Sequence, residues 1–188
     1  MNTTITTAVQ PLSKNELWQH TINAFDNASV YVSTYGKYAG GSLEGAWIDL
    51  ESFDDASQAM DFFRRLHSDE EDPEFMFQDH SNLPRALYHE SMNEDDLAKI
   101  YEWLSLEEDE RDMVKEYWDE YEGMTEIQDI IDRCAYHGNS DDYFDELADE
   151  MLDECKVPDF LRYCFDYEKW RYQCQLDYII TSNYVFHD

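Results

Sequence analysis

The hydrophobic pattern changes its period within the first half of the chain. Apolar, β-branched and aromatic residues cluster over 29–35 and 43–50, which predicts two β-strands. Over 54–66 the apolar positions recur every three or four residues and predict a helix, while 74–78 predict a third strand. Residues 13–16 (SKNE) have the spacing of a helix capping box and precede a short amphipathic stretch. This region therefore predicts a small α+β module.

The pattern of the second half is mostly helical. Three more capping boxes predict helix starts at residues 91–94, 105–108 and 125–128. A stripe of apolar positions at helical spacing then runs through 140–155, and an aromatic-rich segment follows Pro158. Two short apolar runs at the end predict a terminal hairpin, at 177–180 and 183–187.

These elements predict the α+β class, arranged as an elongated chain of small consecutive domains. The expected divisions are an N-terminal extension with a short amphipathic helix (1–27), an α+β domain (28–90), a helical middle domain (91–135) and a C-terminal α+β domain with the terminal hairpin (136–188).

The charge of the chain is large and unevenly placed. Forty-four Asp and Glu residues against thirteen Lys and Arg give a net charge of −31. Residues 1–40 hold two acids and two bases and sum to zero, so the whole excess lies after residue 40. Self-repulsion on this scale opposes a compact state, which suggests that function requires the field. It also predicts raised carboxyl pKa values and a stability that grows as pH falls.

Composition and charge narrow the class of protein. A hydrophobic content of 43% and an aromatic content of 15% favour a folded core over disorder. The acidity argues against direct binding of nucleic acid or anionic lipid, whose phosphates need Lys and Arg, and favours a basic protein surface as partner. We find no apolar run that could span a bilayer and no basic-then-apolar leader, so we expect a cytoplasmic protein. The four cysteines lack zinc-ligand spacing, and we expect them to be free thiols.

The segment 140–155 illustrates how the acids are arranged. It carries eight acids and no base, and its apolar stripe leaves the carboxylates on the opposite side of the helix. Along that side the charges arrive about every ~2.7 Å of helix axis, whereas duplex DNA carries one charge per ~1.7 Å over both strands and ~3.4 Å per strand. Residues 107–122 and 68–79 repeat the acidic pattern.

A solvated helix face accounts for any one of these segments taken alone. The scarcity of Lys and Arg partners at i+4, which ordinarily offset repulsion on a helix surface, favours a different hypothesis, a protein that imitates DNA. The carboxylates expected to form this acidic surface are Asp69, Glu70, Glu71, Asp72, Glu108, Asp109, Asp112, Glu116, Asp119, Glu120, Asp142, Asp145, Glu146, Asp149, Glu150 and Asp153.

Two other classes of function were weighed. Catalysis is disfavoured because the six histidines form no HExxH or i, i+4 metal pair, and no GxSxG elbow or phosphate loop is present. We expect no cofactor and no metal site. Diffuse calcium binding stays open, although the sequence has no EF-hand loop, as does adaptation to high salt or capture of another basic DNA-binding partner.

Several long stretches resemble the ArdA-type antirestriction proteins of mobile elements. They are 31–50 (YVSTYGKYAGGSLEGAWIDL), 66–79 (LHSDEEDPEFMFQD), 157–169 (VPDFLRYCFDYEK) and the terminal 184–186 (YVF). Residues 113–123 (MVKEYWDEYEG) are similar to that family's internal antirestriction motif. Residues up to about 27 do not align with the family pattern.

The resemblance implies an elongated homodimer coated with carboxylates that imitate bent B-form DNA. Such proteins occupy the DNA-binding groove of type I restriction-modification enzymes, on their methyltransferase core, and so protect incoming DNA without breaking a bond. For the dimer contact we name the terminal strand, Tyr184, Val185 and Phe186, because a strand edge at the end of a chain is readily paired.

Overall fold

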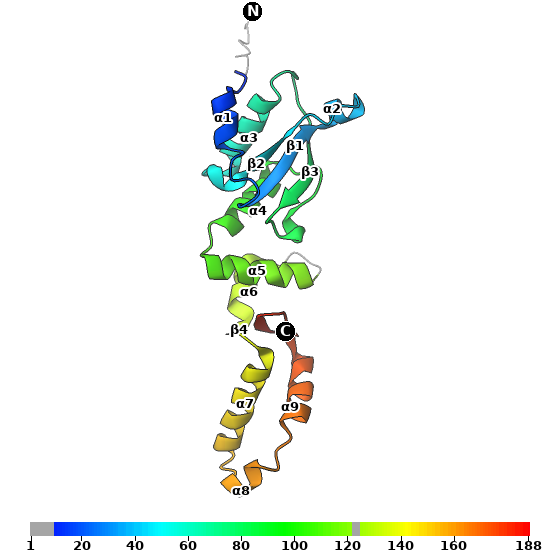
Figure 1. Ribbon diagram of the computed structural model, residues 1–188. Coiled ribbons are helices and arrows are strands. Elements are labelled where there is room, and N and C mark those ends of the chain that lie inside the picture. Colours follow the sequence, from blue (N-terminus) through cyan, green and yellow to red (C-terminus); the bar gives the residue numbers. More distant parts are fainter. Residues whose placement is uncertain (1–9, 122–124) are drawn as a thin grey trace, which may run out of the picture. The chain divides into compact units, whose positions relative to one another are not determined.

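A computed structural model describes residues 10–121 and 125–188 of the chain (Figure 1). The contacts fall into two compact units, Met1–Leu106 and Glu107–Asp188, which we call unit 1 and unit 2. Each unit combines helices with a three-stranded antiparallel sheet. The predicted α+β class is therefore confirmed. The finer division of the chain into four segments stays a prediction.

Unit 1 contains a sheet with the strand order β2-β1-β3, and its register shifts between Tyr31 and Val32. Its elements in chain order are α1 (Lys14–Gln19), β1 (Ser29–Thr34), α2 (Tyr35–Ala39), β2 (Ala46–Asp49), η1 (Leu50–Ser52), α3 (Ala56–Leu66), β3 (Phe75–Ser81), η2 (Arg85–Leu87) and α4 (Glu94–Leu104).

One face of this sheet forms the core of unit 1. Val30 and Val32 of β1 are fully buried, and Phe63 of α3 meets Phe77 of β3 edge-on, with ring centroids 5.8 Å apart. Because side chains alternate along a strand, Tyr31 lies on the other face, where its ring packs against that of Trp47.

The segment before β1 is fastened to unit 1 by side-chain contacts. The capping box of Ser13 and Glu16 is present as predicted. Glu16 also pairs with Arg65 of α3 at 2.6 Å, and the His20 ring stacks on that of Phe53 at 4.3 Å. The region that does not align with the family pattern is thus packed on the first domain from α1 onward.

Unit 2 contains a sheet with the strand order β4-β6-β5, and α7 and α9 lie side by side (Figure 1). Its elements are α5 (Glu108–Glu120), α6 (Ile127–Arg133), β4 (Cys134–His137), α7 (Ser140–Glu154), α8 (Asp159–Arg162), α9 (Tyr167–Cys174), η3 (Gln175–Asp177), β5 (Tyr178–Ile180) and β6 (Tyr184–His187). Phe144, Ile130 and Val185 are fully buried in its core.

The premise behind the predicted dimer contact is wrong. The strand that carries Tyr184, Val185 and Phe186 is the middle strand of its sheet, paired on one side with β4 and on the other with β5. All three side chains are buried within the same chain. The last strand therefore offers no free edge, although it stands at the end of the sequence.

Three of the predicted helix starts also need correction. The cap of α4 is Asn93, which forms a capping box with Asp96, two residues after the predicted box. Ser105 ends α4 instead of opening α5, and its hydroxyl donates to the Glu102 carbonyl. Neither α5 nor α6 has a side-chain cap. A Ser-x-x-Glu spacing is thus a permissive signal, since the same side chains also close helices.

Candidate functional site

The acidic loop after α3 spends part of its charge on its own unit. Asp69 Oδ1 lies 3.0 Å from Lys37 Nζ, and Glu70 Oε1 accepts a hydrogen bond from Thr34 Oγ1 at 2.6 Å. The hydrogen bond from Lys37 lowers the pKa of Asp69. The next two carboxylates, at 71–72, are exposed and have no hydrogen bond or ion pair within the described residues. The loop thus holds both anchoring and outward carboxylates.

Lys37 also contacts a buried histidine beneath this loop. His67 is 1% exposed, and its Nδ1 lies 3.0 Å from Lys37 Nζ. An ammonium group has only donors, so Nδ1 accepts and the ring is neutral. Burial, followed by the charge of Lys37, lowers the pKa of His67. The cation that holds Asp69 is therefore itself oriented by a neutral imidazole.

Helix α5 presents a second acidic surface. Its buried positions, Met113, Val114, Tyr117 and Trp118, follow helical spacing and face the core of unit 2. The acids fall on the remaining sides, and three of them, at 108–110, lie in the first turn, where the helix dipole favours negative charge. The sequence thus sets the carboxylates of α5 outward by fixing its apolar stripe inward.

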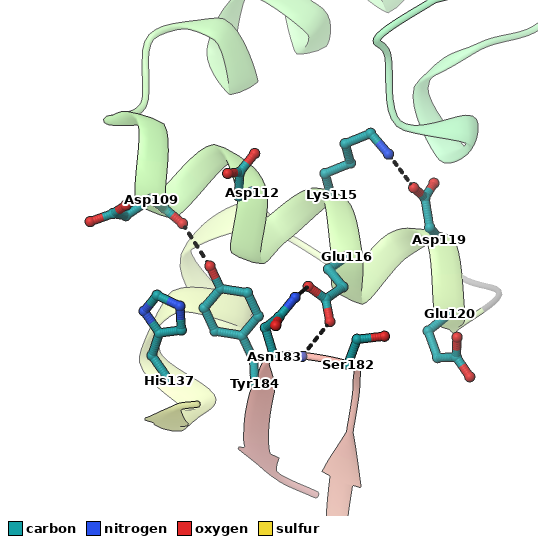
Figure 2. Close-up of a pocket in the computed structure, with 10 residues that line it drawn as sticks. All are labelled: Asp109, Asp112, Lys115, Glu116, Asp119, Glu120, His137, Ser182, Asn183 and Tyr184. Atoms are coloured by element: carbon teal, nitrogen blue, oxygen red, sulfur yellow. Dashed lines mark hydrogen bonds and ion pairs between the residues drawn. The ribbon is translucent and has the colours of Figure 1, made fainter. Parts of the chain in front are cut away.

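The carboxylates of α5 line a groove shared with the turn before β6 (Figure 2). The cavity measures about 610 Å³. It is lined by Asp109, Asp112, Lys115, Glu116, Asp119, Glu120, His137, Ser182, Asn183 and Tyr184. Lys115 is the only lysine or arginine among these lining residues, and its Nζ lies 2.5 Å from Asp119 Oδ2. The lining of the groove is therefore strongly acidic.

Glu116 fastens one wall of this groove to the other. Its carboxylate accepts hydrogen bonds from the backbone N–H of Asn183 at 2.7 Å and from Asn183 Nδ2 at 3.0 Å (Figure 2). Burial alone would raise the pKa of Glu116, but hydrogen bonds from Asn183 and Thr181 outweigh it and the pKa lies below its usual value. Glu116 is thus ionised and structurally engaged.

Tyr184 closes the opposite end of the groove. Its hydroxyl donates to the carbonyl of Asp109 at 3.4 Å, and its ring stacks on that of His137 at 4.5 Å. Burial raises the pKa of Tyr184, and the nearby Asp112 and Glu116 add to the effect. The phenol is therefore a neutral donor that fixes the start of α5 against β6.

Helix α7 carries the third acidic surface, and half of it faces its own unit. Arg171 of α9 binds Asp145 through Nε and Nη2, and its Nη1 lies 3.3 Å from Asp141 Oδ2. The hydroxyl of Tyr167 donates to Asp149 Oδ1 at 2.5 Å. These contacts join α7 to α9.

One more pair continues the same side of α7. Arg162 of α8 binds Asp153 through Nη2, and its Nε donates to the carbonyl of Val157 at 3.3 Å. By contrast, Asp142, Glu146 and Glu150 are exposed, and their carboxylates take part in no hydrogen bond or ion pair among the described residues. Helix α7 thus has one engaged and one unengaged set of carboxylates.

Nothing in the described part of the chain suggests a resident cofactor. Over residues 10–121 and 125–188, no group of three His, Cys, Asp or Glu side chains could hold a metal ion. In the same residues, no helix combines the length and the apolar character needed to cross a bilayer. The chemistry that the site offers is the presentation of negative charge.

Comparison with known families decides the relationship. The family model of "Antirestriction protein (ArdA)" matches residues 30–186. The chain belongs to the ArdA antirestriction family. No curated protein matches it. Membership implies antirestriction activity, exerted as an inhibitor that interacts with restriction-modification enzymes, not as an enzyme.

The ArdA match includes all three acidic surfaces and leaves out the segment that precedes β1. Of the carboxylates expected from the sequence, the structure brings five into one groove, Asp109, Asp112, Glu116, Asp119 and Glu120. The others lie on the loop of unit 1, at the start of α5 and on α7. All are exposed except Glu70, Glu116 and Asp145, which are half-buried.

The sequence analysis missed the groove's neutral residues and the role of the cations. Asn183, His137 and Tyr184 complete the groove but lie far from α5 along the chain. Arg171 and Arg162 hold α7 from α9 and α8, at sequence separations that no helical periodicity reveals. The one available signal was the rarity of Lys and Arg in so acidic a chain, since each remaining cation then has many carboxylates to bind.

Proposed function

We propose that this ArdA-family chain is a DNA mimic that occupies the DNA-binding groove of a type I restriction-modification enzyme. Its carboxylates stand in for phosphates and pair with the Lys and Arg side chains that otherwise hold the duplex. Cleavage of incoming mobile-element DNA, and its modification as well, is then blocked by competition. The proposal goes beyond the antirestriction activity that family membership implies.

The groove along α5 is the observation that carries the proposal. Five carboxylates line it, and the one lysine among the lining residues is already paired with Asp119. Such a surface carries a strong negative potential and attracts a basic partner, which chiefly raises the rate of association and suppresses wrong partners. The exposed acids of α7 and of the loop at 71–72 extend the same chemistry.

The remaining parts of the proposal concern assembly and place of action. We propose that the partner surface is the methyltransferase core, because that is where such an enzyme holds its duplex, and that the protein acts as a homodimer in the cytoplasm, where incoming DNA meets these enzymes. The dimer contact needs a surface other than β6, whose two edges are occupied.

A competition experiment tests the proposal. A purified type I enzyme is bound to its labelled recognition duplex, and the protein is titrated in at several salt concentrations. We expect displacement of the duplex near stoichiometric protein, weakening as salt rises because screening shortens the range of the charges. No displacement at large excess, with the protein folded, would overturn the mimic and direct the search to another basic DNA-binding partner.

A calcium titration serves as the control for the rival explanation of the acidity. Stoichiometric calcium binding at micromolar concentration would favour a calcium-binding protein. Weak and diffuse uptake is the expected result.

A further inference from the structure

The carboxylates of α7 form two parallel rows. Asp141, Asp145, Asp149 and Asp153 are spaced by four residues and therefore lie one above another along the helix. Every member of this inner row contacts a side chain of α8 or α9. The inner row is a continuous line of attachment, not a set of isolated surface pairs.

The outer row is offset from the inner row by a single residue. Asp142, Glu146 and Glu150 repeat at the same spacing of four, at about ~6 Å intervals along the axis. All three are exposed, and none has a hydrogen bond or ion pair within the part of the chain that the structure describes. Because the rows are fixed on one helix, holding the inner row determines where the outer row points.

We propose that Arg171, Tyr167 and Arg162 are positioning residues of the mimic: by binding the inner row they orient α7 so that the outer row meets the target enzyme. This inference rests on the proposed function. It assigns different roles to acids that look equivalent in sequence, and it makes two cations necessary for a protein whose activity depends on negative charge.

The physical basis is preorganisation. The guanidinium of Arg171 has a rigid fork of donors that matches a carboxylate, and it contacts Asp145 through two nitrogens. A helix already held in place loses less conformational freedom when the target binds, and each side chain that need not be ordered at that step favours binding by a factor of about three to ten.

A charge-matched pair of variants tests the proposal by the sign of the effect. Arg171→Ala and Lys169→Ala each remove one positive charge from α9, but the Lys169 side chain has no ion pair or hydrogen bond among the described residues. If only net charge mattered, both variants would displace the duplex at least as well as the parent protein. We expect Lys169→Ala to do so and Arg171→Ala to be weaker by about threefold to tenfold.

Two further measurements separate positioning from loss of fold. Displacement is measured well below the melting temperature, and the far-ultraviolet circular dichroism of each variant is compared with that of the parent. Arg171→Lys keeps the charge without the fork and is expected to restore part of the activity. If Arg171→Ala loses helical signal, Tyr167→Phe replaces it, since that change removes only the hydroxyl bound to Asp149.

Neutralising each row provides an independent test at equal charge. The triple variant Asp142→Asn, Glu146→Gln, Glu150→Gln is expected to keep its melting temperature and to weaken displacement by about tenfold, a factor of about two for each exposed ion pair lost. The matched inner-row variant Asp145→Asn, Asp149→Asn, Asp153→Asn is expected to lose protection of the α7 amides from hydrogen exchange.

The outcomes distinguish this inference from the proposed function. If the parent protein displaces the duplex but Arg171→Ala and Lys169→Ala behave alike, the positioning role is wrong and the mimic stands. If the outer-row variant inhibits as well as the parent protein, the outer row does not meet the target. If the parent protein displaces nothing, the proposed function fails, and unchanged exchange in the inner-row variant would overturn the attachment of α7 as well.

Discussion

Glu116 and Asn183 join α5 to the turn before β6 through two hydrogen bonds, of 2.7 and 3.0 Å, from the backbone and side-chain amides of Asn183. Both residues line the acidic groove of unit 2 (Figure 2). One of the groove's carboxylates therefore stabilises the groove instead of being free to bind a target.

Glu116→Ala is expected to destabilise unit 2 by about ~1 kcal/mol, the net contribution of hydrogen bonds to a partly exposed carboxylate. For a unit of this size, that change lowers the melting temperature by about 4–8 °C. Glu120→Ala is the control, because this exposed residue of the same helix has no hydrogen bond or ion pair within the described residues. Equal melting temperatures for the two variants would show that the contact with Asn183 contributes nothing.

The protein is expected to lose stability in acid. Hydrogen bonds from Arg65 lower the pKa of Glu16 to about 2 from its ordinary 4.5, and Arg171 lowers that of Asp145. A carboxyl whose pKa is lower in the folded state stabilises the fold above its unfolded pKa, and that contribution disappears as pH falls through the folded value. Urea unfolding between pH 6 and pH 2 should therefore show stability falling from about pH 4.5 downward.

This expectation reverses the one drawn from net charge alone. Repulsion among many carboxylates predicts raised pKa values, and burial does raise the pKa of Asp49. Lys37 and Arg171, however, lie directly on Asp69 and Asp145 and lower the pKa values of those carboxyls. Composition could not reveal this, since it records how many cations a chain has and not where they lie. Stability that rose steadily toward pH 3 would favour the repulsion argument.

The fold was predictable where local signals agreed with tertiary pairing. The capping box at 13–16 and the β-branched run of β1 lie where the periodicity placed them. The strand Cys134–His137 was missed because it follows α6 without a break and is a strand only through its pairing with β6, some fifty residues later. The short helix Tyr35–Ala39 was missed because its glycine-containing sequence indicated a loop.

The candidate site was predictable to the level of helix faces. An apolar stripe fixes which side of α5 and α7 is solvated, so the exposure of acids such as Asp112 and Glu146 followed from spacing. The same rule gave no way to separate Asp145 from Glu146. Their difference arises from Arg171, twenty-six residues after Asp145, and contacts between helices depend on packing that periodicity does not encode.

His67 is expected to titrate below its ordinary pKa of 6.5 because burial, and then Lys37, disfavour its protonation. Lys37→Met removes that charge and should raise the pKa of His67 toward 6.5, as followed by the ring C–H signals in an NMR titration. Since the unfolded chain binds this proton more readily, His67 stabilises the fold above pH 6.5, and the contribution falls as pH drops below that value. A pKa that Lys37→Met leaves unchanged would rule out the electrostatic role of the ammonium group.

Trp118 is expected to be the most sensitive tryptophan of the acidic surfaces, although it carries no charge. It is 6% exposed on the inner side of α5, and its Nε1–H donates to the Thr125 carbonyl at 3.0 Å. Trp118→Ala should destabilise unit 2 by about 3–5 kcal/mol and abolish duplex displacement by unfolding the helix that presents the groove. Trp118→Phe keeps most of the volume, loses the hydrogen bond and should cost about ~1 kcal/mol. Trp18→Ala, at a site 61% exposed, is the control and should change stability by less than about 0.5 kcal/mol. Thermal melts of the three variants decide the matter, because a Trp118→Ala protein that melts like Trp18→Ala would mean that the inner stripe of α5 does not hold the acidic face in place.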